Sequence, residues 1–178
     1  SYEAISLAKS GTWIEVRDSS FAGNARCVDI AWQTTMNATN TFQNVAFFGN
    51  TGSAGGSCIS MAGSGVNFLG EACAFDRNVC LSGSEGIQFN CSGSGDIAKL
   101  RNCSFTDNAS YGNTSGLLYF GNGMAVAGPD KAFRVENCTF TGNTYDTVAS
   151  SDNGLHSAVF VRGHNNIVQI EGCYFADN

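Results

Sequence analysis

Residues 100–108 read LRNCSFTDN and residues 135–143 read VENCTFTGN, so phenylalanine followed three positions later by asparagine recurs in the same setting. This F-x-x-N motif occurs six times, at intervals of 26 to 35 residues. Its phenylalanines are Phe21, Phe47, Phe75, Phe105, Phe140 and Phe175, and its asparagines are Asn24, Asn50, Asn78, Asn108, Asn143 and Asn178. A motif that repeats at this period is typical of one supersecondary unit stacked on itself.

The residues that precede each phenylalanine alternate in polarity. Positions two, five and seven residues earlier are mostly small or apolar, as in Phe133, Val135 and Cys138 before Phe140. A period of two indicates a half-buried strand. The position four residues before the phenylalanine is polar, and we expect it to face water; it holds Arg17, Gln43, Glu71, Arg101, Glu136 and Glu171.

A second apolar segment precedes each of these strands. The six segments are residues 4–7, 27–30, 58–61, 80–82, 117–119 and 158–160. The chain has 22 glycines and one proline, which suits tight turns between short strands. It shows no 3.6-residue apolar period with helix caps, so we predict an all-β chain. We expect a single domain, residues 1–178, folded as a right-handed parallel β-helix of about six coils with no evident caps. Successive coils would lie about 4.8 Å apart, so the phenylalanines and asparagines would form two internal ladders.

One repeat also carries a glycine pair downstream of its F-x-x-N motif. Residues 47–50 are followed by Gly55-Gly56-Ser57-Cys58-Ile59, a G-G-A-[ILV]-like segment. This pairing of motifs resembles the repeats of the chlamydial polymorphic outer membrane protein family. The resemblance covers the whole chain as F-x-x-N copies, although the glycine pair is intact only once. It implies a surface-exposed β-helical passenger with a role in adhesion.

The sequence also suggests an extracellular or cell-surface location through its N-glycosylation sequons. Asn108 carries a sequon but is a ladder asparagine, so we expect it to point inward. Asn102 and Asn137 occupy the same place in consecutive repeats, three residues before the phenylalanine. The remaining sequons are expected in variable loops, so the predicted glycosylation sites are Asn37, Asn90, Asn102, Asn113 and Asn137.

Eight cysteines occur without a C-x-x-C pair, so neither zinc nor any other cofactor is predicted. We expect two columns and one cysteine in a loop: Cys27, Cys58 and Cys80; Cys73, Cys103, Cys138 and Cys173; and Cys91. Stacked thiols can pack as small hydrophobes. Disulfides across the coil remain the alternative, because neighbours within a stack have parallel Cβ vectors.

Several functional classes are disfavoured. A net charge of −6 argues against a nucleic-acid partner, and no apolar run approaches the ~20 residues of a membrane span. Glu136 and Glu171 would lie one coil apart on the outer face, where paired carboxylates could perform catalysis. However, Arg17 and Arg101 share that column, which favours charge pairing on a solvated strand face. We therefore predict that the protein is not an enzyme.

The repeat phase is continuous if residue 178 of one copy is followed by residue 1 of another. Uncapped solenoid ends expose strand edges and core side chains. We therefore predict a structural protein that stacks head to tail into a filament or surface layer through Ala4, Ile5, Leu7, Cys173 and Phe175. Its partner would be a second copy of itself, with glycans or a cell surface as further possible partners. The alternatives are a piece of a longer repeat array, an adhesin that binds through residues 84–96, 107–116 and 141–156, and a polysaccharide lyase or hydrolase.

Overall fold

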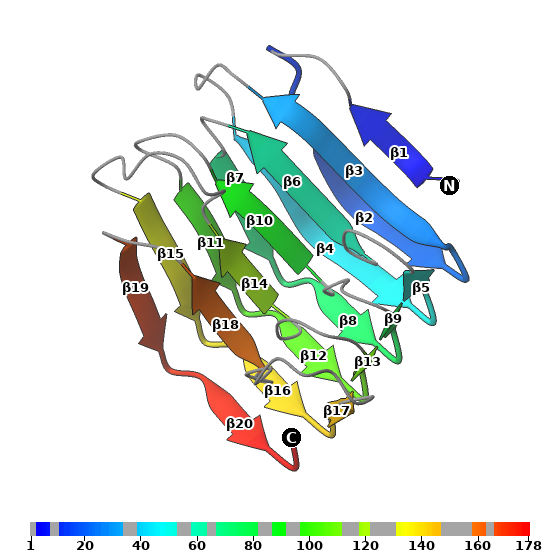
Figure 1. Cartoon of the computed structure of the whole chain (residues 1–178), viewed down its shortest axis with the longest axis vertical. Coiled ribbons are helices and arrows are strands. Elements are labelled where there is room, and N and C mark those ends of the chain that lie inside the picture. Colours follow the sequence, from blue (N-terminus) through cyan, green and yellow to red (C-terminus); the bar gives the residue numbers. More distant parts are fainter. Residues whose placement is uncertain are drawn as a thin grey trace, which may run out of the picture.

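The computed structural model describes residues 3–7, 11–33, 39–52, 58–63, 67–81, 87–91, 97–111, 118–121, 131–146, 158–162 and 166–178. Their regular elements are all β-strands, and these form three sheets in which every strand pair is parallel. The chain advances along the stack coil by coil, so that β1 (Glu3–Leu7) and β20 (Tyr174–Ala176) lie at opposite ends (Figure 1). The predicted all-β fold, a parallel β-helix, is confirmed.

The first sheet contains one strand from each coil. Its order is β1, β3 (Arg26–Gln33), β6 (Ile59–Gly63), β10 (Ile87–Cys91), β14 (Leu118–Gly121) and β18 (Val159–Arg162). Equivalent aliphatic residues stand in register, as Ile5, Val28, Ile59 and Ile87 do. These side chains face the core, because a parallel in-register stack keeps one side of every strand inward.

The second sheet contains the F-x-x-N strands, which bend at one residue. Its strands are β2 (Glu15–Ala22), β4 (Asn40–Phe48), β7 (Asn67–Glu71) with β8 (Ala74–Asp76), β11 (Ile97–Arg101) with β12 (Ser104–Thr106), β15 (Lys131–Glu136) with β16 (Thr139–Thr141), and β19 (Asn166–Glu171) with β20. The bend lies three residues before the phenylalanine, where φ is 54° at Asn44, 55° at Asn102 and 52° at Asn137. A left-handed residue turns the strand, so both of its parts can cover one interior.

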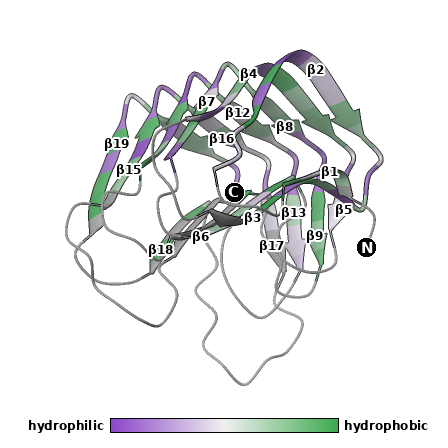
Figure 2. Ribbon diagram, turned by 90° about the horizontal axis from the view of Figure 1, so that it is seen from above, coloured by the Kyte–Doolittle hydropathy of each residue, from purple (hydrophilic) through white to green (hydrophobic). Residues whose placement is uncertain are grey.

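A third sheet follows the ladder asparagines and was not predicted. It contains β5 (Thr51–Gly52), β9 (Val79–Leu81), β13 (Ala109–Tyr111) and β17 (Thr144–Asp146). A second positive-φ residue precedes each of Asn50, Asn78, Asn108 and Asn143 and directs the chain into this sheet, for example Gly49 with φ 59° and Asp107 with φ 51°. Figure 2 shows the three sheets surrounding a common interior.

The observed strands correct three expectations from the sequence. Cys80 lies in β9, paired with Gly52 and Ser110, and therefore does not share a column with Cys27 and Cys58. The first-sheet strand of that coil is β10 rather than residues 80–82. Asn90 and Cys91, which we expected in a loop, are both part of β10. A short apolar triplet cannot by itself reveal which sheet it joins, since both strand types look alike at this length.

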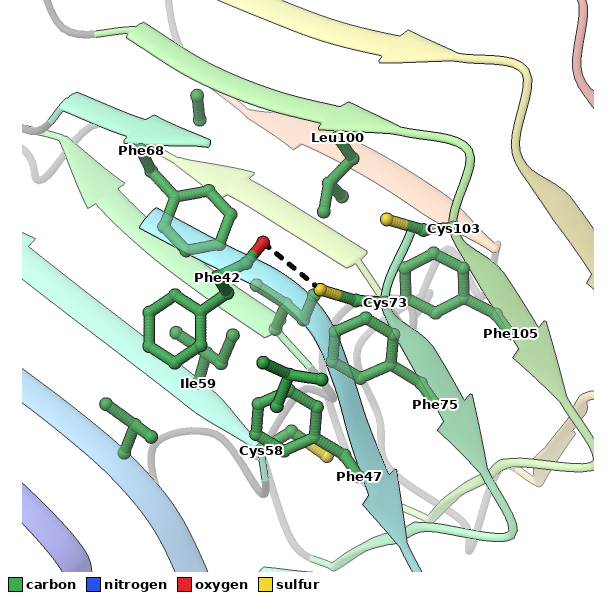
Figure 3. Packing of buried hydrophobic residues seen from close by; sticks show 14 of the residues in the cluster. Phe42, Phe47, Cys58, Ile59, Phe68, Cys73, Phe75, Leu100, Cys103 and Phe105 are labelled. Atoms are coloured by element: carbon green, nitrogen blue, oxygen red, sulfur yellow. Dashed lines mark hydrogen bonds between the residues drawn. The ribbon is translucent and has the colours of Figure 1, made fainter. Parts of the chain in front are cut away.

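Phenylalanine dominates the core, and Figure 3 shows its packing with aliphatic side chains and thiols. The fully buried rings belong to Phe42, Phe47, Phe68, Phe75, Phe105, Phe133 and Phe140. One buried polar side chain, Asn40, stands in register with Phe68. Its Oδ1 accepts the Ile14 N–H at 3.2 Å, and its Nδ2 donates to the Asn67 carbonyl at 3.2 Å. This amide therefore links three successive coils.

Candidate assembly interface

The F-x-x-N phenylalanines form a continuous ladder of stacked rings. Neighbouring ring centroids are 4.6 to 5.1 Å apart from Phe21 to Phe175, and the ring planes differ by no more than 9°. The spacing equals the strand separation, because each ring projects from the same position of its coil. The ladder therefore presents the face of a ring to any further coil at either end.

The asparagine ladder has a direction along the rod. Asn78 donates its backbone N–H to Asn108 Oδ1 at 2.9 Å and its Nδ2–H to the same oxygen at 3.0 Å. Its second Nδ2–H goes back to the Phe47 carbonyl at 3.0 Å. Asn50, Asn108 and Asn143 repeat this pattern. Each coil thus donates forward from its asparagine, and each buried asparagine is satisfied on both sides.

The last described coil leaves apolar side chains and strand edges open. Among the described residues, β19 and β20 have a neighbouring strand on one side only. Val168, Ile170 and Phe175 stand in register with Phe133, Val135 and Phe140, all of which have 0% exposure. The three are nevertheless 42%, 46% and 45% exposed. We call β18, β19 and β20, together with the residues that join β19 to β20 and follow β20 as far as Asn178, the C-terminal face.

The first described coil is also open, but less so. Here β1 pairs only with β3 and β2 only with β4 among the described strands. Ile5, Leu7 and Phe21 are half-buried against the core, and Ala4 is exposed. Ile5 is in register with Val28, so Ala4 occupies the position that the buried Cys27 has in the next coil. We call β1 and β2, together with the residues that flank β2 from Ile14 to Asn24, the N-terminal face. The five predicted self-association residues therefore lie on the two open faces, with Cys173 half-buried beside Phe175.

The second cysteine column is present as predicted. The Cys103 N–H lies 3.4 Å from Cys138 Sγ, and the Cys138 N–H lies 3.4 Å from Cys173 Sγ. The seven cysteines whose side chains the structure describes are free thiols, which favours stacked small hydrophobes over bridges across the coil. Hydrogen bonds to Cys138 and Cys73, together with burial, raise the pKa of the Cys103 thiol. Burial raises the pKa of Cys173. Both groups therefore stay protonated at neutral pH.

The outer charged column forms ion pairs between coils. Lys99 Nζ lies 2.8 Å from Glu136 Oε1, and Arg101 Nε lies 3.4 Å from Glu136 Oε2. Arg101 also reaches Glu71 at 3.7 Å. The hydrogen bond from Lys99, supported by Arg101, lowers the pKa of Glu136. Glu171 is in register with Glu136 and accepts a hydrogen bond from Gln169. A carboxylate with a lowered pKa is a poor proton donor, so this column fits charge pairing better than acid–base catalysis.

The sequons differ in accessibility. Asn102 and Asn137 are exposed at the bend of the second sheet. Asn108 is buried and donates both Nδ2 hydrogens within the ladder, so it points inward as predicted. Asn90 lies in β10, whereas Asn37 and Asn113 fall outside the described residues.

Other candidate features add no site. The two histidines of the sequence, His156 and His164, lie outside the described residues, as do most of the residues in the loops predicted for adhesion. Trp13, just before β2, is 55% exposed, which is common for a single aromatic side chain on a protein surface. Within the described ranges, no cluster of three His, Cys, Asp or Glu side chains could coordinate a metal, and no helix has the length and apolarity for a membrane span.

Comparisons with protein-family models, curated proteins and solved structures find no match to this chain. The resemblance to the chlamydial repeats stays a prediction.

Proposed function

We propose that the chain is an extracellular structural protein that stacks head to tail, C-terminal face on N-terminal face, to build a filament or surface layer. One observation carries the proposal: Val168, Ile170 and Phe175 occupy core positions of the repeat and remain about half exposed. Exposed strand edges and core side chains at a solenoid end favour association with a further coil.

The apolar contribution can be estimated. Fully burying a Val, Ile or Phe side chain gives about 1.5–3 kcal/mol. Since these three are 42–46% exposed, covering them gives roughly 2–4 kcal/mol in total. This contribution from the C-terminal face alone does not exceed the entropic cost of association, about 4–15 kcal/mol. Stable stacking therefore also requires the strand edges to pair and the amide ladder to continue.

Glycosylation and location belong to the same proposal. Asn102 and Asn137 are exposed at the outer bend of two inner coils rather than on an open face. Glycans there would leave the junction clear, which supports a secreted, N-glycosylated filament subunit. Mass spectrometry of the secreted protein before and after glycosidase treatment checks occupancy, and an unmodified Asn102 and Asn137 would contradict this part.

Sedimentation velocity and negative-stain microscopy test the assembly. We expect concentration-dependent rods for the wild type and loss of assembly in Phe175→Glu. The matched control is Phe48→Glu, because Phe48 is similarly exposed at 42% but lies on the side of the rod. Wild-type protein that stays as single short rods at every concentration refutes the proposal, as does equal assembly of the two variants.

A further inference from the structure

We propose that this junction is polar and has one register, with Asn178 of one copy donating to Asn24 Oδ1 of a second copy. The inference rests on the proposed function and deepens it, because it specifies the partner surface and the polarity of the assembly. In this register β19 and β20 of one copy pair in parallel with β2 of the next copy, just as β2 pairs with β4 of the following coil within the chain.

The hydrogen-bond direction of the asparagine ladder supports this polarity. Asn178 uses one Nδ2–H for the Phe140 carbonyl, as every inner asparagine does toward the preceding coil. Its backbone N–H and second Nδ2–H occupy the positions that donate forward in the other coils. At the opposite end, Asn24 Nδ2 turns to its neighbour, the Ala22 carbonyl, at 3.3 Å. Asn24 Oδ1 occupies the position that accepts two hydrogen bonds in the other coils.

The two open faces are therefore complementary. The C-terminal face offers amide donors at Asn178, and the N-terminal face offers the Asn24 acceptor. Contact between two C-terminal faces would place donors against donors, and contact between two N-terminal faces would place acceptors against acceptors. A mismatched buried polar group costs about 1–3 kcal/mol, so only the head-to-tail contact satisfies both faces.

The register follows from the side chains that this pairing would align. Phe175 would stack on Phe21, Ile170 on Val16 and Val168 on Ile14, so that aromatic side chains meet aromatic ones and aliphatic side chains meet aliphatic ones. A slip of one residue would turn these side chains to the solvent face. The left-handed bends would also coincide, because Gly172 with φ 62° would meet Asp18 with φ 47°.

Charge complementarity supports the same register on the outer face. Glu171 of one copy would lie beside Arg17 of the next, just as Glu136 lies beside Arg101 within the chain. Both Glu171 and Arg17 are exposed, so each is accessible to a second copy. A register shifted by one residue would separate these opposite charges.

Two variants, each blocked at one face, test the polarity. Ser19→Arg places a bulky cation on the N-terminal face at an exposed position. Asn178→Asp replaces the side-chain amide donor of the C-terminal face with a negatively charged acceptor that would face Asn24 Oδ1. We expect each variant to be monomeric alone and an equimolar mixture to form a one-to-one dimer, because one open face of each remains functional. Phe175→Glu serves as a second C-terminal block, and circular dichroism confirms that every variant is folded.

A charge exchange tests the register. We expect Arg17→Glu to weaken stacking up to about fivefold, the usual range for an exposed pair, and Arg17→Glu with Glu171→Arg to restore it. The polar junction is refuted if either blocked variant forms dimers alone, or if the double exchange does not restore stacking. If the wild-type protein still assembles in that case, the proposed function stands. Wild-type protein that never assembles overturns the proposed function itself.

Discussion

Replacing Asn108 by alanine should be among the most damaging single changes in this protein. Its side chain makes four hydrogen bonds: two accepted from Asn78, at 2.9 and 3.0 Å, and two donated to Phe75 and Asn143, at 2.9 and 3.0 Å. Asn78 is fully buried, so neither of its two abandoned donors can reach water. At about 1–3 kcal/mol for each buried unsatisfied group, the variant should lose roughly 2–6 kcal/mol of stability.

Asn24→Ala is the matched control at the open end of the same ladder. It removes the Nδ2 bonds to Asn50 Oδ1 and to the Ala22 carbonyl. Asn50 Oδ1 keeps the Asn24 backbone N–H at 2.9 Å, so this change leaves no buried acceptor abandoned. We therefore expect a loss of only about 0.5–1.5 kcal/mol, the net value of an ordinary hydrogen bond.

Equilibrium unfolding in urea, followed by far-ultraviolet circular dichroism, measures both changes. Comparable m-values are needed, because solenoids can unfold in parts and then give no single free energy of unfolding. A difference of less than about 1 kcal/mol between the stability losses of Asn108→Ala and Asn24→Ala would show that the contribution of a ladder amide to stability does not depend on its burial. That result would refute this prediction.

Three further predictions use the same measurement. Gly142→Ala should lose more stability than Gly23→Ala. Both glycines have positive φ, but the new Cβ at position 142 would overlap Asp107 Oδ1, whereas the one at position 23 meets nothing within 4 Å. Equal losses of stability in the two variants would contradict this. Phe105→Ala should lose about 3–5 kcal/mol by removing a buried ring from the middle of the ladder, and a loss below about 1 kcal/mol would count against tight packing. Glu136→Gln should lower stability at neutral pH only. The folded-state pKa of Glu136 lies below its unfolded value, so the stabilisation by this carboxylate exists above about pH 4.3 and disappears as the pH falls through the folded pKa. A difference in stability between the wild type and Glu136→Gln that persists at low pH would refute this prediction.

Much of the fold followed from the repeat itself. Once the six F-x-x-N copies were aligned, the inward phenylalanines and asparagines, the outward charged column and the Cys73 to Cys173 column were all predictable. The third sheet was missed because its strands are only two or three residues long and have no period of their own. For the same reason Cys80 was placed in the wrong column and Asn90 in a loop.

By itself, the sequence determined what repeats and which side of each strand is buried, because a period of two and a fixed repeat leave one face for the core. Only the tertiary structure decided the direction of the asparagine ladder, since an amide can donate to either neighbouring coil until the backbone fixes which oxygen it meets. It also decided that Glu136 forms ion pairs with Lys99 and Arg101, which depends on contacts between coils. The polarity of the proposed junction follows from that three-dimensional arrangement, and no linear motif encodes it.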